Sequence, residues 1–565
     1  MDQVLSTGNT LPARVTPLVR SASADFSSKL FLVVDRVQEM QRAISMSLNA
    51  IGINRVDYAT RPSEALSRLG SHSYDAVLCD YDLGRGYDGL HLLEEIKHRN
   101  LIKQSCVFMI VTAERRSERV ISAAELAPDA YLLKPFTGEQ MRVRLERSLR
   151  RRGALMGIDD YLLRNEFLDA ITECDKRIAA HDEFMLDFMK LKGSLCLKTG
   201  DYVTARALYQ EVVKIKPLPW AQMGLAKSLT ELKQYEPARV LFEEVLKENN
   251  RLMEGYDWLA RVYEAKQDLA QAEATLKTAT QLSPVVMRRQ KRLGEVAMLN
   301  EDYPTATAAF EQTIELAKYS IYRCADDYAA LARAHLASGN ISAAQEVSSI
   351  LQRELRGEEV ADWVASLVDC QVAAASQEAE KGNALLDAAV DKHAVLSKEL
   401  SDDCQLELVH ACYRNGREDV GRRIVQQLVM NNHDNEALLE RVTQVFQLLG
   451  RKEDGIKLIA DNVQSVVDLN NEAVRLAQAG QLEAAVACFR QALEEVPSNT
   501  QIMLNAVNAI LALVHRKGWQ DEFIQTARDY LERVRRSDAA NGKFQKLLAS
   551  YRSTVEKHGQ HQWML

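Results

Sequence analysis

The sequence lacks the features that would place the protein in a membrane or around a metal framework. None of its uninterrupted apolar runs reaches the length that a helix needs to cross a bilayer. Its nine cysteines are scattered, with no CxxC pair and no Cys/His cluster at zinc spacing. We therefore expect reduced core thiols in the cytoplasm, and no membrane association. The Ser/Thr-rich first 28 residues lack the continuous apolar segment of a signal peptide and predict a flexible tail.

Signatures of catalysis and of DNA binding are also absent. The sequence contains no HExxH motif, no P-loop and no Ser/His/Asp arrangement typical of a hydrolase. These absences argue against an enzyme. No helix-turn-helix or winged-helix segment follows the first domain, so we do not expect direct DNA binding.

The chain is long enough for several domains, and its N-terminal and C-terminal parts differ in net charge. Its 565 residues, 47% hydrophobic and 27% charged, predict two to four globular domains. Residues 1–152 carry 22 Lys and Arg against 18 Asp and Glu, whereas the remaining residues carry 49 against 61. A long acidic C-terminal part repels phosphate backbones, so nucleic acid is not expected to be its main ligand.

The first domain, residues 29–150, alternates apolar strands with amphipathic helices. The predicted strands are residues 29–35, 56–59, 76–79, 107–113 and 130–136, and the predicted helices are residues 38–51, 62–69, 90–97, 119–126 and 138–152. This alternation predicts a doubly wound α/β fold with a five-stranded parallel sheet and helices on both faces.

Asp80 follows the buried strand at residues 76–79, and a lone aspartate at such a place usually caps a turn or helix. Asp35, Thr112 and Lys134 follow the first, fourth and fifth strands. Adjacent parallel strands bring their carboxyl ends together, so these side chains should converge on one crevice. The set suits phosphoryl transfer to Asp80, with a lysine and a hydroxyl near the phosphoryl oxygens and Mg²⁺ bridging carboxylates and phosphate.

These landmarks, together with the segments VTAE and YLLKPF, resemble the receiver domain of bacterial two-component response regulators, a chemotaxis-regulator-like, flavodoxin-like fold. The resemblance implies that Asp80 is the phosphoacceptor and Thr112 the switch hydroxyl. It implies further that Lys134 contacts the phosphate and that the rotamer of Tyr131 reports activation. It also implies a cis peptide bond at Lys134-Pro135.

The implied metal site departs from the family at one position. The resemblance implies Mg²⁺ held by Asp35, Asp80 and Asp82, but the second of the usual two adjacent acidic residues is Arg36 here. The family makes its contact at the position of Asp82 through a main-chain carbonyl, and the Asp82 side chain would have to compensate. We expect a lowered metal affinity, or the arginine itself in the cation's place. Two hypotheses follow: a phosphorylatable receiver, and a pseudo-receiver with a differently controlled state.

The last helix of this domain ends in a basic cluster made up of Arg142, Arg144, Arg147, Arg150, Arg151 and Arg152. A solvated helix end is the simplest interpretation, because basic side chains suit a helix C-terminus. An acidic partner or nucleic acid is a second interpretation. The family often pairs receivers through this face, so a homodimer contact is a third.

The second part of the chain is helical and repetitive. A motif of a large residue, alanine and a second large residue begins at Tyr202, Tyr235, Leu269 and Tyr303, in steps of 33, 34 and 34 residues. This period resembles tetratricopeptide repeats and implies an all-α superhelical solenoid. Residues such as Gly193 and Gly294 would allow close helix packing.

The array is expected to span residues 160–520, after a linker at 151–159 and before capping helices and a tail at 521–565. An N-terminal helix pair is predicted near residues 160–178, irregular helices across 362–400, and a further clean repeat from Gly480. Pentatricopeptide RNA-binding arrays have a slightly longer period, and the acidic balance and residue spacing here favour the protein-binding kind.

The sequence as a whole predicts a response regulator of a phosphorelay in which Asp80 controls a protein-binding tetratricopeptide output. The alternative is a pseudo-receiver adaptor that binds proteins independently of phosphorylation. The expected partners are a sensor histidine kinase or phosphotransfer protein and an unidentified protein in the groove of the solenoid.

Overall fold

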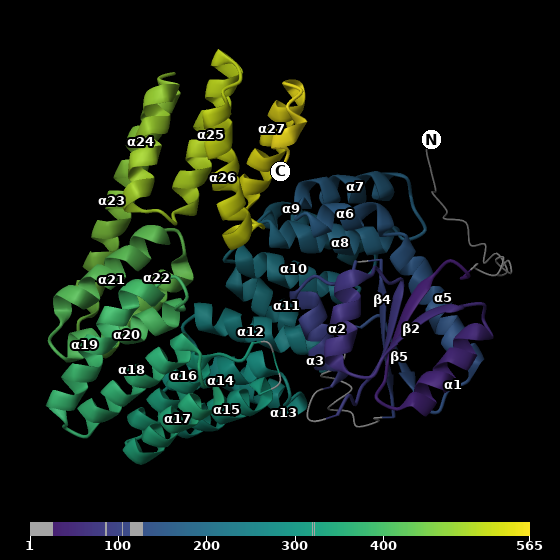
Figure 1. The fold of residues 1–565 in the computed structure, drawn as a ribbon, viewed down its shortest axis with the longest axis horizontal. Coiled ribbons are helices and arrows are strands. Elements are labelled where there is room, and N and C mark those ends of the chain that lie inside the picture. The colour runs from purple at the N-terminus through teal and green to yellow at the C-terminus, as the bar shows by residue number, and fades with distance from the viewer. Residues whose placement is uncertain (1–25, 85–87, 104, 114–127, 319, 321) are drawn as a thin grey trace, which may run out of the picture. The chain divides into compact units, whose positions relative to one another are not determined.

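The computed structural model describes residues 26–84, 88–103, 105–113, 128–318, 320 and 322–565 (Figure 1). These residues divide into two compact units, one ending at Met156 and the other beginning at Gly157. Each unit has hydrophobic cores of its own. Among the described residues, no helix combines the length and the apolar character that a membrane span requires.

The first unit is built on a parallel sheet whose strands run in the order β2-β1-β3-β4-β5. The strands are β1 (Leu30–Val34), β2 (Arg55–Ala59), β3 (Ala76–Asp80), β4 (Val107–Thr112) and β5 (Ala130–Leu133). All four neighbouring pairs are parallel. The predicted five-stranded, doubly wound sheet is confirmed, because continuous apolar segments favour strands that are buried on both faces.

Helices cover both faces of this sheet (Figure 1). They are α1 (Gln38–Asn49), α2 (Pro62–Ser71), α3 (Gly89–His98) and α5 (Gly138–Gly153). On one face, Ile44 of α1 and Leu145 of α5 pack against Phe31 and Met109. Phe26 is buried in the same core, ahead of residue 29, where the sequence predicts the domain to start. The helix predicted at residues 119–126 lies outside the described residues.

The second unit is helical. Its first half comprises α6 (Met156–Leu163), α7 (Phe167–Ala179), α8 (Met185–Lys198), α9 (Tyr202–Ile215), α10 (Pro219–Glu231), α11 (Tyr235–Glu248), α12 (Met253–Ala265), α13 (Leu269–Leu282), α14 (Met287–Leu299), α15 (Tyr303–Ala317) and α16 (Ala325–Ala337). The second half comprises α17 (Ile341–Glu354), α18 (Glu359–Ala375), α19 (Ala379–Leu396), α20 (Asp402–Arg414), α21 (Glu418–Asn431), α22 (Glu436–Leu448), α23 (Lys452–Gln478), α24 (Leu482–Glu495), α25 (Thr500–Lys517), α26 (Asp521–Asp538), α27 (Gly542–Lys557) and the 3-10 turn His561–Trp563.

The repeated motif marks the start of the second helix in successive helix pairs. Tyr202, Tyr235, Leu269 and Tyr303 are the first residues of α9, α11, α13 and α15. The turn before each of these helices contains a residue with positive φ, namely Gly200, Lys233, Gln267 and Glu301. The 34-residue period is therefore the period of one helix pair and its turn.

Aromatic side chains of the second helices fit against glycines of the first. A Cβ added to Gly193 of α8 or Gly224 of α10 would lie 2.5 or 2.3 Å from the Tyr209 ring of α9. Gly294 of α14 meets Phe310 of α15 in the same way. The predicted role of Gly193 and Gly294 in close helix packing is confirmed.

One segment of the array differs from the sequence-based expectation, and another was not predicted at all. The segment predicted to hold irregular helices forms the regular antiparallel pair α18 and α19, in which buried Trp363 donates to the Ala389 carbonyl at 2.8 Å. The segment that was not predicted is α23, whose 27 residues serve as second helix to α22 and first helix to α24. No proline interrupts this segment, which allows the helix to continue without a break.

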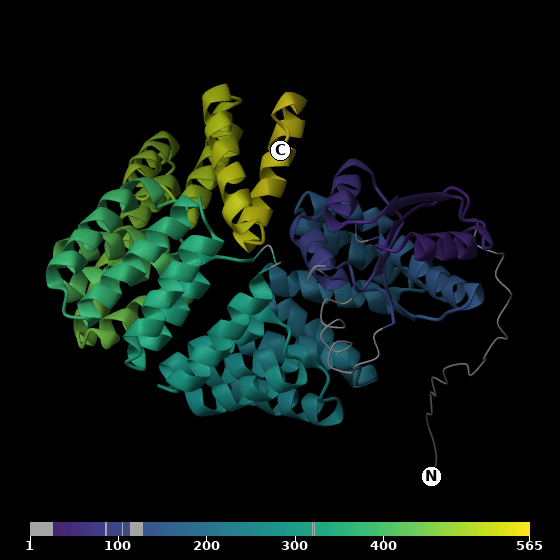
Figure 2. The same ribbon diagram turned by 60° about the horizontal axis from the view of Figure 1, so that its bottom comes forward.

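The last helix, α27, contacts the start of α7 and the residues just before it, near the beginning of the array (Figures 1 and 2). Gln545 of α27 accepts a hydrogen bond from the Phe167 N–H at 2.8 Å and donates to the Asn165 carbonyl at 2.6 Å. Arg552 of α27 pairs with Glu166 at 2.6 Å. Because Glu166 and Gln545 are each 3% exposed, these contacts form a buried clasp between the two ends of the array.

Candidate functional site

Four polar side chains gather at the carboxyl end of the sheet in the first unit. Asp35 follows β1, Asp80 ends β3, Thr112 ends β4 and Lys134 follows β5. The parallel registers set the ends of adjacent strands level with one another. The backbone N–H of Lys134 donates to the Thr112 carbonyl at 2.7 Å, which ties β5 to β4 at this edge.

Lys134 joins two carboxylates of this cluster. Its Nζ lies 3.1 Å from Asp35 Oδ2 and 3.1 Å from Asp80 Oδ1. The Asp35 side chain is 1% exposed and that of Asp80 is 13% exposed, so solvent screens this contact weakly. The Lys134-Pro135 peptide bond is cis, as the resemblance implies.

Asp35 is held rigidly by its neighbours. Its Oδ1 accepts the Val37 N–H at 2.8 Å, and its carbonyl accepts the Gln41 side-chain amide at 2.7 Å. The same Gln41 amide donates to the Ala59 carbonyl at the end of β2. The start of α1 is therefore anchored to the sheet through Asp35.

Asp80 is the more accessible of the two carboxylates, with its side chain 13% exposed against 1% for Asp35. Burial raises its pKa, the Lys134 ammonium lowers it in part, and the negative charge of Asp35 raises it further. A carboxylate with a raised pKa is more basic when ionised, and therefore a better nucleophile. Its side chain keeps some solvent access, which an incoming group needs.

Tyr131 and Thr112 occupy the adjacent strands. Thr112 is 3% exposed, and burial raises the pKa of Tyr131. Within the described part of the chain, the buried Tyr131 hydroxyl has no hydrogen-bond partner. A buried hydroxyl without a partner lowers the stability of the folded protein by about 1–3 kcal/mol. This cost favours any Tyr131 rotamer in which the hydroxyl reaches a hydrogen-bond partner.

Arg36 follows Asp35 directly in the chain, and its side chain is paired with Asp82. Its guanidinium contacts Asp82 Oδ2 at 2.8 Å, while Asp82 Oδ1 accepts the Gly84 N–H at 3.0 Å. Gly84 has φ +85°, and a Cβ there would come within 3.5 Å of the guanidinium. The side chains of Arg36 and Asp82 are 53% and 61% exposed, so the pair itself is worth about 1 kcal/mol or less.

The side chains present do not fit a divalent cation in the arrangement observed. Among the described residues, no group of three or more Asp, Glu, His or Cys side chains could hold a metal ion. Asp35 and Asp80 share the Lys134 ammonium, and both oxygens of Asp82 are engaged by Arg36 and Gly84. The Mg²⁺ site implied by the resemblance is not assembled by Asp35, Asp80 and Asp82.

Comparison with known proteins agrees with this geometry. The model of the response regulator receiver domain matches residues 31–146. The chemotaxis protein CheY-3 of Vibrio cholerae serotype O1 is 32% identical over 120 residues, which are 21% of this chain and 91% of that protein. The chain belongs to the response regulator family. The chemotaxis protein CheY of Pseudomonas aeruginosa is 30% identical to this response regulator over 120 residues, covering 21% of this chain and 95% of that protein.

The second unit of the response regulator contains tetratricopeptide repeats. A tetratricopeptide repeat model matches residues 258–321, which lie in α12 to α15 and the segment after them. A solved CheY-like receiver domain from Methanospirillum hungatei has 22% identity and a TM-score of 0.20, covering 22% of this chain and 97% of that chain. The two matched family models together give a receiver followed by tetratricopeptide repeats.

The first helices of the repeats are joined by charged pairs that the sequence analysis missed. Repeat architecture places these helices along the groove of the array. The pairs between different first helices are Lys227 with Glu254, Glu231 with Arg261, Asp257 with Arg289, Glu264 with Arg292, Lys291 with Asp327, Arg333 with Glu407, and Asp403 with Arg441. In six of these pairs the opposite charges are about one repeat apart in the sequence, which was the available signal, whereas Arg333 and Glu407 are about two repeats apart.

Arg333 of α16 contacts more than one charged side chain of the first helix α20. Besides its contact with Glu407, it interacts with Asp403 and lowers the pKa of His410. Burial is the main reason that the pKa of His410 falls to about 4, and the cations Arg414 and Arg333 add to it. Glu407 also accepts the Gln371 side-chain amide at 3.0 Å.

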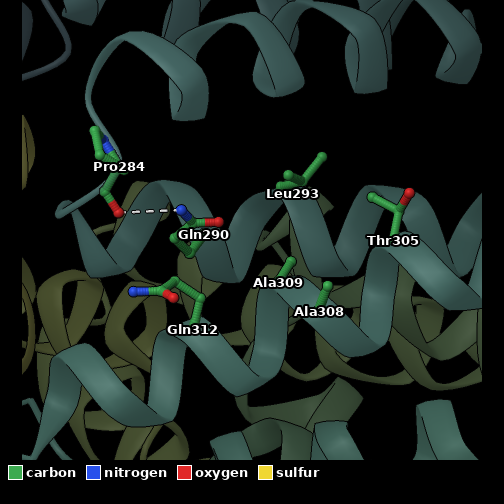
Figure 3. Close-up of a pocket in the computed structure, with 7 residues that line it drawn as sticks. All are labelled: Pro284, Gln290, Leu293, Thr305, Ala308, Ala309 and Gln312. Atoms are coloured by element: carbon green, nitrogen blue, oxygen red, sulfur yellow. Dashed lines mark hydrogen bonds between the residues drawn. The ribbon is translucent and has the colours of Figure 1, made fainter.

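A shallow pocket lies between α14 and α15 (Figure 3). Its volume is about 370 Å³, and Leu293 and Ala309 form its apolar floor. Gln290 donates to the Pro284 carbonyl at 3.1 Å, and Gln312 lies on the opposite helix. The lining carries no charged side chain, so the pocket offers room for a small apolar group and no strong anchor.

Proposed function

We propose that this protein is a response regulator of a phosphorelay in which Asp80 accepts a phosphoryl group and thereby controls a protein-binding tetratricopeptide output. The observation that carries the proposal is the Lys134 ammonium between Asp35 and Asp80. The donor is a sensor histidine kinase or a phosphotransfer protein. In the transfer, an Asp80 oxygen forms a bond to phosphorus while the bond from phosphorus to the donor histidine nitrogen breaks.

The cluster supplies a route from phosphorylation to a change of surface. The added charge on Asp80 draws Lys134 away from Asp35, and the Thr112 hydroxyl becomes a ligand of the phosphoryl oxygens. The unsatisfied Tyr131 hydroxyl then favours a different rotamer. The array responds only where its contacts differ between the two receiver states.

The phosphoacceptor is tested by incubating the full-length protein with acetyl phosphate and measuring intact mass. We expect a one-phosphoryl gain for the wild type and none for Asp80→Asn. A wild type that gains no mass, under conditions that label a known receiver, would exclude Asp80 as an acceptor.

A pseudo-receiver adaptor is the second candidate, and the Arg36–Asp82 pair favours it. In that case the array would bind its partner to the same extent in wild type and Asp80→Asn, with or without acetyl phosphate. A partner whose affinity changes on phosphorylation of the wild type alone would rule the adaptor out.

We also propose domain limits close to the expected 1–28, 29–150, 151–159, 160–520 and 521–565 for tail, receiver, linker, array and cap, except that the receiver starts at Phe26, which is buried in its core. Residues 1–25 of the expected tail lie outside the described residues. A receiver homodimer is supported by two apolar side chains, Leu133 of β5 and Val143 of α5, which are 48% and 52% exposed. Sedimentation of wild type and Val143→Lys tests it, and identical mass for both would argue against this face.

A further inference from the structure

Arg36 adds a positive charge to the loop after β1, directly after Asp35, which contacts Lys134. A transferred phosphoryl group spreads negative charge over three oxygens and is stabilised by cations placed around it. Guanidinium stays protonated at every pH that proteins tolerate, and its planar fork matches phosphate oxygens. Arg36 follows Asp35 directly, so its backbone is fixed at the end of β1, next to β3 and Asp80.

The loop after β3 accommodates this side chain. Asp82 fastens the guanidinium, and the Gly84 N–H holds the other Asp82 oxygen. Gly84 lies against the guanidinium without a side chain of its own and has the positive φ that glycine adopts readily. The carboxylate that would replace the missing acidic ligand therefore binds the arginine instead.

Charge explains why a divalent cation is disfavoured here. Asp35, Asp80 and Asp82 are balanced by Lys134 and Arg36, which leaves one net negative charge in the cluster. An acidic residue at position 36 would leave three. At a separation of about 8 Å in a dielectric of about 80, that difference changes the affinity for a doubly charged ion by a factor of roughly 30.

We propose that the Arg36 guanidinium is a built-in cation that takes the place of the divalent ion, so that this receiver accepts a phosphoryl group without a metal. The pair with Asp82 is exposed and weak, which lets the guanidinium leave Asp82 and turn to the phosphoryl oxygens at little cost. The phosphoryl part of this inference rests on the proposed function of Asp80, whereas the exclusion of the metal does not.

Metal binding is the first test. Mn²⁺ binding to the full-length protein is measured by electron paramagnetic resonance for wild type, Arg36→Asp and Arg42→Asp. Arg42 is an exposed residue of α1, so its substitution makes the same change in net charge away from the cluster. We expect Arg36→Asp to bind Mn²⁺ at least tenfold more tightly than wild type and Arg42→Asp to match wild type. Equal affinities of wild type and Arg36→Asp would overturn the inference.

Labelling is the second test and separates the two proposals. With acetyl phosphate, wild type should gain the same phosphoryl mass in excess chelator as in Mg²⁺, and Arg36→Asp should require Mg²⁺. Wild-type labelling that depends on Mg²⁺ would overturn the built-in cation while leaving Asp80 as the acceptor. No wild-type labelling together with the Mn²⁺ difference would remove the acceptor role and the metal-free transfer, leaving only the exclusion of the metal. If Arg36→Asp is misfolded by circular dichroism, Arg36→Gln takes its place with the same direction expected.

Discussion

Lys134 is the residue on which the receiver cluster depends. It is the shared partner of Asp35 and Asp80, two carboxylates that are largely withdrawn from water. Removing one member of a buried ion pair is costly because the remaining charge is left without compensation.

We therefore expect Lys134→Met to destabilise the receiver by roughly 3 kcal/mol at neutral pH. The loss should be smaller in an Asp80→Asn background, because only Asp35 then remains charged. The loss of stability in each background is measured by hydrogen exchange of the β3 and β4 amides in the full-length protein. Equal losses in both backgrounds would show that the Lys134 contact with Asp80 is energetically silent.

His410 makes the stability of the folded array depend on pH. Its pKa falls from an ordinary value of 6.5 to about 4, first through burial and then through Arg414 and Arg333. The unfolded chain therefore binds a proton below pH 6.5 that the folded array does not bind until about pH 4. The sign is a loss of stability as pH falls through this window.

The free energy of unfolding of the array should fall by roughly 1–2 kcal/mol between pH 6.5 and 4.5. Solvent screens the partly exposed ring to some extent, so the fall is smaller than the full pKa shift would give. Substituting His410→Gln should remove this component and leave the titration of the acidic residues. Thermal unfolding of both proteins at a series of pH values gives the comparison. If the unfolding temperatures of wild type and His410→Gln fall in parallel with pH, His410 is not the source of this pH dependence.

Among the helices, α8, α9 and α10 depend on a ring placed between two glycines. A Cβ at Gly224 would lie 2.3 Å from the Tyr209 ring, far inside contact distance. Alanine is favoured over glycine within a helix by about 1 kcal/mol, so propensity and packing oppose each other here.

Packing should prevail, and Gly224→Ala should destabilise the array by about 1–3 kcal/mol. Tyr209→Leu introduced with it should recover part of the loss, whereas Tyr209→Leu alone should be destabilising. Urea unfolding followed by circular dichroism tests the three variants. A stabilising Gly224→Ala would mean that the ring moves aside freely.

The clasp between α7 and α27 is the second prediction at the scale of elements. Gln545→Leu keeps much of the side-chain volume but leaves the Phe167 N–H and the Asn165 carbonyl without their partner. Each unsatisfied buried group costs about 1–3 kcal/mol.

Faster hydrogen exchange in α7 and α27 is the expected result for Gln545→Leu. Lys546→Ala, at the exposed neighbouring position, serves as the control and should leave the exchange unchanged. Unaltered protection in α7 with Gln545→Leu would show that the two ends of the array do not stabilise each other.

For the whole molecule, the division into two units predicts two unfolding steps. The receiver core and the cores of the array share no residue. Differential scanning calorimetry of the full-length protein should resolve two transitions, and Lys134→Met should lower only one of them. A single transition shifted as a whole would mean that the units unfold cooperatively.

Particular residues show how far the sequence could be used. Asp35, Asp80, Thr112 and Lys134 each follow an apolar strand, so their convergence was predictable from strand order alone. The regular pair α18 and α19 was not predicted, because its sequence departs from the repeat motif while its helices still pack as a pair. The assigned roles of Asp80, Thr112, Lys134 and Tyr131 stay predictions until labelling is measured.

The sequence by itself determined the parallel sheet and the 34-residue period, because hydrophobic periodicity and turn residues act over a few neighbouring positions. Only the tertiary structure decided that Asp82 holds Arg36 and that α27 closes on α7. The first depends on how two loops from different strands meet. The second depends on the small rotation of each repeat, summed over the array until residues almost 400 positions apart come into contact.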